Sequence, residues 1–184
     1  MIVDYFAAPW VSTAYWPEII DTGKQIIMKR VFLHGLESSS RGAKARFLQE
    51  KFPDMLIPDL QGSLAARMAT LATILKDQKD LILVGSSFGG LMATIYAMTN
   101  EADINRIVLL APALNFPDFL HYPKIRVAVP TWMFIGSDDT VTPAKLVVPL
   151  ARGIFKDLHY KEVADDHMLA GTFRHFDWQG LLDR

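Results

Sequence analysis

The sequence predicts one α/β domain, a three-layer α/β/α sandwich built on a mainly parallel sheet. From Met28 onward, short apolar runs alternate with stretches that have helical spacing. Most of these runs are apolar at successive positions, which is typical of parallel strands covered on both faces. The 184 residues suit a single domain, and a composition with 51% hydrophobic and 21% charged residues is that of a folded globular chain.

The first elements of the expected sheet occupy residues 30–75. The run RVFLHG (30–35) ends in glycine and predicts a strand that leads into a turn. Apolar residues at helical spacing predict a helix over 41–52, and the run MLIPDL (55–60) predicts the next strand. The stretch 64–75 then predicts an amphipathic helix, with one apolar face formed by Leu64, Met68, Leu71, Ala72 and Leu75.

The alternation continues to the end of the chain. The apolar run 80–85 predicts a strand that leads into a helix over 89–100. Three further apolar runs predict strands at 106–113, 130–136 and 158–163, and the tail 171–184 predicts a closing helix. No repeat or linker divides this pattern, so we expect a single domain over 1–184 with its core in 28–184.

Residues 1–27 have no sustained hydrophobic period. They are rich in aromatic residues and proline, namely Pro9, Trp10, Tyr15, Trp16 and Pro17. Two readings stay open for this segment. It is either an N-terminal extension, packed on the domain or over its mouth or added upstream of the natural start, or an ordinary first hairpin of the sheet.

Charge and composition exclude several classes of partner. The formal net charge of −1 favours neither nucleic acid nor an anionic membrane surface, and the apolar runs are too short to span a bilayer. The chain has no cysteine, which excludes disulfides and thiolate chemistry. The first residues lack the features of a secretory signal. We therefore expect a cytoplasmic protein without nucleic-acid or membrane partners, and the sequence predicts no particular oligomeric state.

Residues Gly85 to Gly89 fit the pattern Gly-x-Ser-x-Gly between a predicted strand and a predicted helix. A serine on so sharp a turn needs neighbours without bulk two positions away, and Gly85 and Gly89 meet that need. The turn lifts the hydroxyl of Ser87 above the carboxyl ends of the strands, where ligands bind in open α/β sheets. Ser86 would point elsewhere. A phosphate-binding loop would carry a lysine after its glycines, where this sequence has Leu91.

Four motifs occur in order along the chain: FLHGLESS (32–39), the serine turn, FIGSDDTVTP (134–143) and VADDHML (163–169). With them, the sequence resembles the α/β hydrolase superfamily, and most closely its short, lidless YqiA-like serine esterases, from about Met28 to Arg184. The resemblance implies an α/β hydrolase fold without a full lid, a Ser-His-Asp triad and no cofactor. A serine at the turn, where related dehalogenases and epoxide hydrolases carry a carboxylate, speaks against their chemistry.

The resemblance also implies where an oxyanion would bind. The two donors would be the backbone N–H groups of Leu36 and of Phe88, the residue after the serine. His34 would then be a hydrogen-bonded turn residue, and its rival role is that of catalytic base.

The acid and the base of the triad follow from the last two motifs. Asp139 matches the spacing of the family's acid loop, and Asp138 is its competitor. His167 follows the last predicted strand, which gives the chain order Ser, Asp, His. Asp165 and Asp166 adjoin the histidine and are left outside the triad. The other histidines fit the order less well; they are His34, His121, His159 and His175.

The acidic and histidine residues near the end of the chain match no known metal-ligand spacing, so no metal site is predicted. They are His159, Glu162, Asp165, Asp166 and His167.

The predicted reaction is transfer of an acyl group from a small ester or thioester to water, through an acyl-enzyme on Ser87. Phe116, Phe119 and Met168 are candidates for an apolar substrate wall, although the first two also fit as core side chains under a loop. Only residues 112–129 separate two strands where larger relatives insert a lid, so an open mouth and short to medium acyl chains are expected. Two alternatives remain, a binding protein that retains the triad and a peptidase or amidase.

Overall fold

The computed structural model describes residues 28–183, at whose centre lies a five-stranded sheet. All neighbouring strands are parallel and follow the order β1-β2-β3-β4-β5. The strands are β1 (Lys29–Leu33), β2 (Leu81–Ser86), β3 (Ile104–Leu110), β4 (Thr131–Gly136) and β5 (Leu158–Val163). The expectations for 1–27 lie outside the described residues and stay predictions.

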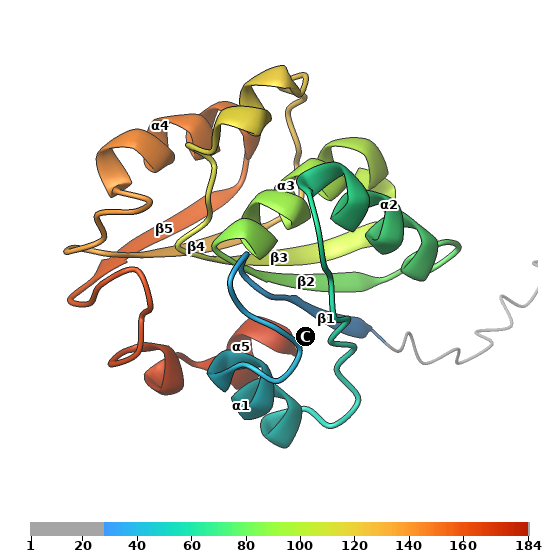
Figure 1. The fold of residues 1–184 in the computed structure, drawn as a ribbon, viewed down its shortest axis with the longest axis horizontal. Helices are drawn as coiled ribbons and strands as arrows, with labels where there is room; N and C mark the ends of the chain where they lie inside the picture. The colour runs from blue at the N-terminus through green and yellow to red at the C-terminus, as the bar shows by residue number, and fades with distance from the viewer. Residues whose placement is uncertain (1–27, 184) are drawn as a thin grey trace, which may run out of the picture.

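Helices cover both faces of the sheet. They are α1 (Ala43–Lys51), α2 (Leu64–Ile74), α3 (Phe88–Asn100), α4 (Ala144–Ile154) and α5 (Trp178–Leu182). Figure 1 shows α2, α3 and α4 on one face and α1 and α5 on the other. Short 3₁₀ helices lie at η1 (Glu101–Asp103), η2 (Pro117–His121) and η3 (Phe173–His175). The predicted three-layer α/β/α architecture is confirmed.

Two apolar cores follow from this layering. One joins α2, α3 and α4 to the sheet and includes Leu71, Leu83 and Leu91; the other joins α1 and α5 to it and includes Val84 and Trp178. Adjacent residues of β2 thus enter opposite cores, and β2 is buried at every position. This explains why its sequence is apolar throughout.

The predicted strand at 55–60 is wrong in extent. Only Leu56 pairs with β1, through an isolated parallel bridge to Val31. Pro58 lacks the N–H that a longer ladder would need.

The predicted closing helix over 171–184 is also wrong in extent. It is divided into η3 and α5, with Phe176 and Asp177 between them. The Asp177 side chain accepts a hydrogen bond from the Gly180 N–H (2.9 Å), and so begins a new helix there.

The helix α4 was not predicted from the sequence. Its buried residues Val147, Ala151 and Ile154 have helical spacing, but Pro149 lies in the middle of the helix and weakens the pattern.

Candidate active site

Ser87 lies on the sharp turn between β2 and α3, with φ 53° and ψ −115°. A residue other than glycine in this left-handed region is strained by about 1–3 kcal/mol, so its surroundings must hold it there. The Ser87 N–H donates to the Leu110 carbonyl (2.8 Å), and the Ser87 carbonyl accepts from the N–H groups of Gly90 (2.9 Å) and Ala113 (3.0 Å). Contacts from α3 and from the end of β3 therefore fix the turn.

The glycines of the turn are required by space. A Cβ on Gly85 would lie 2.5 Å from the carbonyl oxygen of Gly89, and a Cβ on Gly89 would overlap the carbonyl oxygen of Leu33. Neither position accepts a larger residue without moving the backbone. As a result, β1, β2 and α3 meet closely beside Ser87.

Ser87, His167 and Asp139 form one hydrogen-bonded row. The Oγ of Ser87 lies 3.0 Å from Nε2 of His167, and Nδ1 of His167 lies 2.8 Å from Oδ2 of Asp139. The three residues follow β2, β5 and β4, so they meet at the carboxyl edge of the sheet. Their roles in catalysis stay predictions.

Asp139 is buried, and four hydrogen-bond donors surround its carboxylate. Oδ1 accepts from the backbone N–H groups of Val141 (2.9 Å) and Thr142 (2.7 Å), and Oδ2 accepts from the Thr142 hydroxyl (2.6 Å) and from His167. Burial opposes the charge, but the bonds from Thr142 and the contact with His167 outweigh it and hold the pKa of Asp139 below its ordinary value. Asp138, its competitor in the sequence, is exposed.

Thr142 is a site residue that the sequence analysis did not identify. Its buried hydroxyl contacts both Asp139 and His167, at 2.6 Å from Oδ2 of Asp139 and 3.1 Å from Nδ1 of His167. It also lies 3.2 Å from the Ala111 carbonyl, beside the serine turn. The only signal in the sequence was its place between Val141 and Pro143 in the acid motif.

The loop after β5 that carries His167 is held in place by its own carboxylates and by α1. Asp165 accepts from the N–H and hydroxyl of Thr172 (2.8 Å each), and Asp166 accepts from the Met168 N–H (2.8 Å). Lys44 of α1 donates to the Met168 carbonyl (2.5 Å). Both aspartates therefore hold the loop in shape through local hydrogen bonds.

The turn after β1 lies beside Ser87. A Cβ on Gly35 would be 3.6 Å from the Cβ of Ser87. His34 is buried; its Nε2 accepts from the Leu60 N–H (3.0 Å), so Nδ1 carries the proton and donates to the Gly35 carbonyl (2.8 Å). These bonds fit the turn role expected for His34. Within residues 28–183, the N–H groups of Leu36 and Phe88 donate no hydrogen bond, and their expected role as oxyanion donors stays a prediction.

The three candidates for the substrate wall differ in exposure. Phe116 is half-buried and packs edge-on against Phe88, with ring centroids 5.1 Å apart. Met168 is exposed, next to His167. Phe119 has 0% exposure and lies in the core, so its position fits the core reading that the sequence left open.

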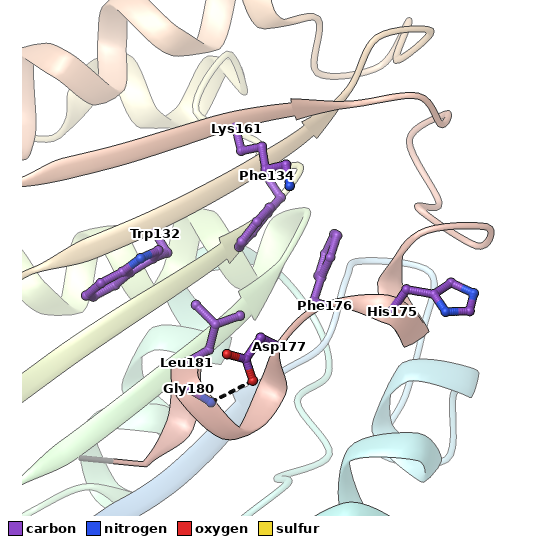
Figure 2. Close-up of a pocket in the computed structure, with 8 residues that line it drawn as sticks. All are labelled: Trp132, Phe134, Lys161, His175, Phe176, Asp177, Gly180 and Leu181. Atoms are coloured by element: carbon purple, nitrogen blue, oxygen red, sulfur yellow. Dashed lines mark hydrogen bonds between the residues drawn. The ribbon is translucent and has the colours of Figure 1, made fainter.

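A separate cavity of about 490 Å³ lies against β4, β5 and α5. Figure 2 shows Trp132, Phe134 and Phe176 around it, with the ring of His175 turned outward. None of its lining residues belongs to the row of Ser87, His167 and Asp139.

In the described part of the chain, no cluster of three or more histidine or carboxylate side chains is arranged around a common point for a metal ion. Likewise, none of the helices between residues 28 and 183 has the length and hydropathy of a membrane-spanning segment.

Known structures share this fold. Est1E from Butyrivibrio proteoclasticus with bound ferulic acid is 15% identical, with a TM-score of 0.69 over 81% of this chain and 84% of that chain. Mouse alpha/beta hydrolase domain-containing protein 10 is 17% identical, with a TM-score of 0.67 over 80% and 85%. A YdeN-like hydrolase from Pectobacterium atrosepticum is 22% identical, with a TM-score of 0.66 over 84% and 86%. At these identities, the likeness establishes the α/β hydrolase fold.

A search of curated protein sequences found no significant match. The model of one protein family, described as the uncharacterised protein family UPF0227, matches residues 29–133. This range runs from β1 through the serine turn into β4 and covers more than half of the chain. The protein thus has the α/β hydrolase fold and belongs to the uncharacterised family UPF0227.

Proposed function

We propose that this protein is a serine hydrolase that cleaves small carboxylic esters or thioesters with short to medium acyl chains. The observation that carries the proposal is the row in which Ser87 Oγ lies 3.0 Å from His167 Nε2 and His167 Nδ1 lies 2.8 Å from Asp139 Oδ2. Both distances are within the range needed for proton transfer between a nucleophile and its base. The names of the structurally similar hydrolases support the same class of reaction.

The reaction divides into two acyl transfers. Ser87 Oγ attacks the carbonyl carbon as His167 Nε2 takes its proton, and the oxyanion is bound by the N–H groups of Leu36 and Phe88. The C–O or C–S bond then breaks, and His167 returns the proton to the leaving alcohol or thiol. Water repeats the attack on the acyl-enzyme, and the carboxylic acid leaves with Ser87 restored.

Asp139 has a supporting role in both transfers. Its carboxylate accepts the Nδ1 proton of His167, which keeps Nε2 free to act as the base, and it stabilises the imidazolium when His167 is protonated. The lowered pKa of Asp139 keeps the carboxylate ionised throughout the neutral range.

An apolar rim supports the choice of acyl substrates. Each of the three loops around Ser87 carries one large exposed apolar side chain: Leu36 (47%), Val141 (58%) and Met168 (60%). Exposed apolar groups beside polar catalytic groups are typical of sites for partly apolar ligands. Such a rim contacts a few carbon atoms and leaves a longer chain in water.

The reaction class is tested with a fluorophosphonate probe, which reacts with activated serines. Wild-type protein should be labelled and should hydrolyse p-nitrophenyl acetate, and Ser87→Ala should do neither. Ser86→Ala, at the neighbouring position on β2, is the control and should retain labelling. Folded wild-type protein that is not labelled would contradict the proposal and support the binding-protein alternative.

The substrate range is tested with p-nitrophenyl esters of increasing chain length and with matched thioesters and amides. We expect the highest kcat/KM with short to medium esters or thioesters. Met168→Ser should raise KM for the longer of these, whereas Ile125→Ser, at an exposed apolar position before β4, should not. A maximum with long-chain esters would refute the proposed chain length, and faster cleavage of amides would support a peptidase or amidase.

A further inference from the structure

Arg67 on α2 is only 3% exposed, although an arginine side chain is always charged. Within residues 28–183 it forms no salt bridge. It donates instead to three backbone carbonyls, those of Gly62 (3.0 Å), Gly35 (3.4 Å) and Leu36 (3.0 Å). A buried charge that no carboxylate contacts directly is costly, and Asp59 acts on this one only from beyond salt-bridge distance.

Two of these carbonyls belong to the turn that carries a predicted oxyanion donor. The Gly35 carbonyl and the Leu36 N–H are parts of one peptide unit, and in a trans peptide they point in opposite directions. Arg67 and the Nδ1 of His34 both hold the Gly35 oxygen. The Leu36 N–H is therefore directed away from both side chains and cannot turn around without breaking these bonds.

The same guanidinium also contacts the residue of the second predicted donor. It lies over the ring of Phe88, 5.3 Å from the ring centroid, and Phe88 is the first residue of α3. The first N–H groups of a helix have no partner inside the helix, so the Phe88 N–H is available at this point. Arg67 thus touches both residues whose N–H groups are expected to bind the oxyanion.

We propose that Arg67 is a positioning residue of the oxyanion hole, which holds the Gly35–Leu36 peptide and Phe88 in one fixed arrangement. The inference rests on the proposed function and adds to it a residue that contacts neither substrate nor reacting atoms. Because the oxyanion forms in the transition state, loss of Arg67 should lower kcat and leave KM nearly unchanged.

The chain contains a matched control in Arg106 of β3. Arg106 also donates to three backbone carbonyls, those of Gly180, Leu181 and Asp183 (2.9 Å each), and it lies 4.8 Å over the ring of Trp132. These contacts anchor α5 by the cavity of Figure 2, away from the serine turn. Arg67→Met and Arg106→Met therefore remove similar interactions from two different places.

The test compares kcat and KM for an activated ester in both variants at a temperature where both are folded. Arg67→Met should lower kcat by about 10- to 100-fold with KM within about twofold of wild type, and Arg106→Met should keep the wild-type kcat. The apparent pKa of the kcat profile should stay unchanged in Arg67→Met, because the contacts between His167 and Asp139 remain.

Arg67→Lys provides a second measurement and replaces Arg67→Met where that variant does not fold. Lysine keeps the charge but lacks the planar fork that reaches several carbonyls, so an intermediate kcat is expected. Equal kcat in wild type, Arg67→Lys and Arg67→Met would overturn the inference and leave the proposed function intact. A wild type without hydrolysis or labelling would refute the proposed function, and the inference with it.

Discussion

The two ends of the central sheet are held in different ways. At the amino ends of the strands, Arg30 and Arg106 donate to the last carbonyls of α5, and both arginines remain only partly buried. At the carboxyl ends, His34, Asp139 and Thr142 are buried, as is Arg67 beside them. The contacts of Arg30 and Arg106 with α5 are an ordinary cap on the carboxyl end of a helix.

This difference in burial shows that the polar side chains at the carboxyl ends of the strands lower the stability of the fold unless each is hydrogen-bonded. A polar side chain at the water boundary loses little solvation, whereas a buried one must replace every hydrogen bond to water with one to protein. Within residues 28–183 the buried side-chain nitrogen and oxygen atoms all have a partner. The buried polar side chains at the carboxyl edge are therefore all hydrogen-bonded, and changes there should affect activity more than matched changes elsewhere.

The largest difference in activity is expected between alanine variants of two histidines, His167 and His175. His167→Ala should lower kcat/KM for an activated ester by about 10⁴-fold or more, because it removes the proposed base. His175→Ala, which changes a residue beside the cavity near α5, should retain nearly full activity. Comparable losses in both variants would contradict the assignment of His167.

A second comparison separates the two adjacent aspartates. Asp139→Asn should lower kcat by about 10³- to 10⁴-fold, because an amide does not favour the required tautomer of His167. Asp138→Asn should change kcat less than about twofold, since this side chain is exposed. Steady-state kinetics with one ester measures kcat for both variants. A larger loss of kcat in Asp138→Asn than in Asp139→Asn would make Asp138 the acid.

A third comparison uses two buried threonines, Thr142 in the loop between β4 and α4 and Thr131 at the amino end of β4. Thr142→Val removes a donor to Asp139, and Thr131→Val removes a buried hydroxyl that bonds the Val129 carbonyl (2.9 Å) at the amino end. Each should lower the free energy of unfolding by about 1–2 kcal/mol at neutral pH. Of these two decreases in the free energy of unfolding, only that of Thr142→Val should depend on pH.

The direction of that pH dependence follows from the lowered pKa of Asp139. A carboxyl whose pKa is lower in the folded state adds stability above its unfolded pKa of about 4, and that stability is lost as pH falls through the folded value. Without the Thr142 donor the folded pKa rises and this contribution shrinks. The free energies of unfolding of wild type and Thr142→Val, measured in urea, should therefore become more similar as the pH falls below about 4. A constant difference would contradict the link to Asp139.

The smallest effects are expected from glycine substitutions at the neighbouring Ser87 and Ser86, which should change the free energy of unfolding in opposite directions. Ser87→Gly should raise the free energy of unfolding by about 1 kcal/mol, because glycine adopts φ 53° without strain, while labelling is lost. Ser86→Gly should lower it by about 0.5–1 kcal/mol, because Ser86 is part of β2. A stabilised Ser86→Gly or a destabilised Ser87→Gly would contradict the strain argument.

Much of this arrangement could be predicted because it depends on local sequence. The apolar runs give the parallel strands, and the glycines on both sides of Ser87 give the turn. The order of the serine, aspartate and histidine motifs gives three loops at one edge of the sheet. The limits of Met55–Leu60 and of the C-terminal helix depended instead on single residues, Pro58 and Asp177, which interrupt otherwise continuous patterns.

The supporting residues could not be predicted because their role depends on contacts far apart in the chain. Arg67 is a lone charge on an apolar helix, and only the packing of α2 against the turn after β1 brings it to the Leu36 carbonyl. The choice between Asp138 and Asp139 depended on which side chain the loop buries. The hydroxyl of Thr142 is indistinguishable in sequence from that of Thr140 beside it.

The bond between the Ala113 N–H and the Ser87 carbonyl limits where the connection after β3 can be lengthened. Residues 111–113 support the Ser87 turn, and an insertion there would remove that support. Leu120 lies further along the same connection and is 74% exposed. A helical hairpin grafted after Leu120 would leave residues 111–113 and the Ser87 turn unchanged, so this scaffold should accept such an added module with the serine geometry preserved.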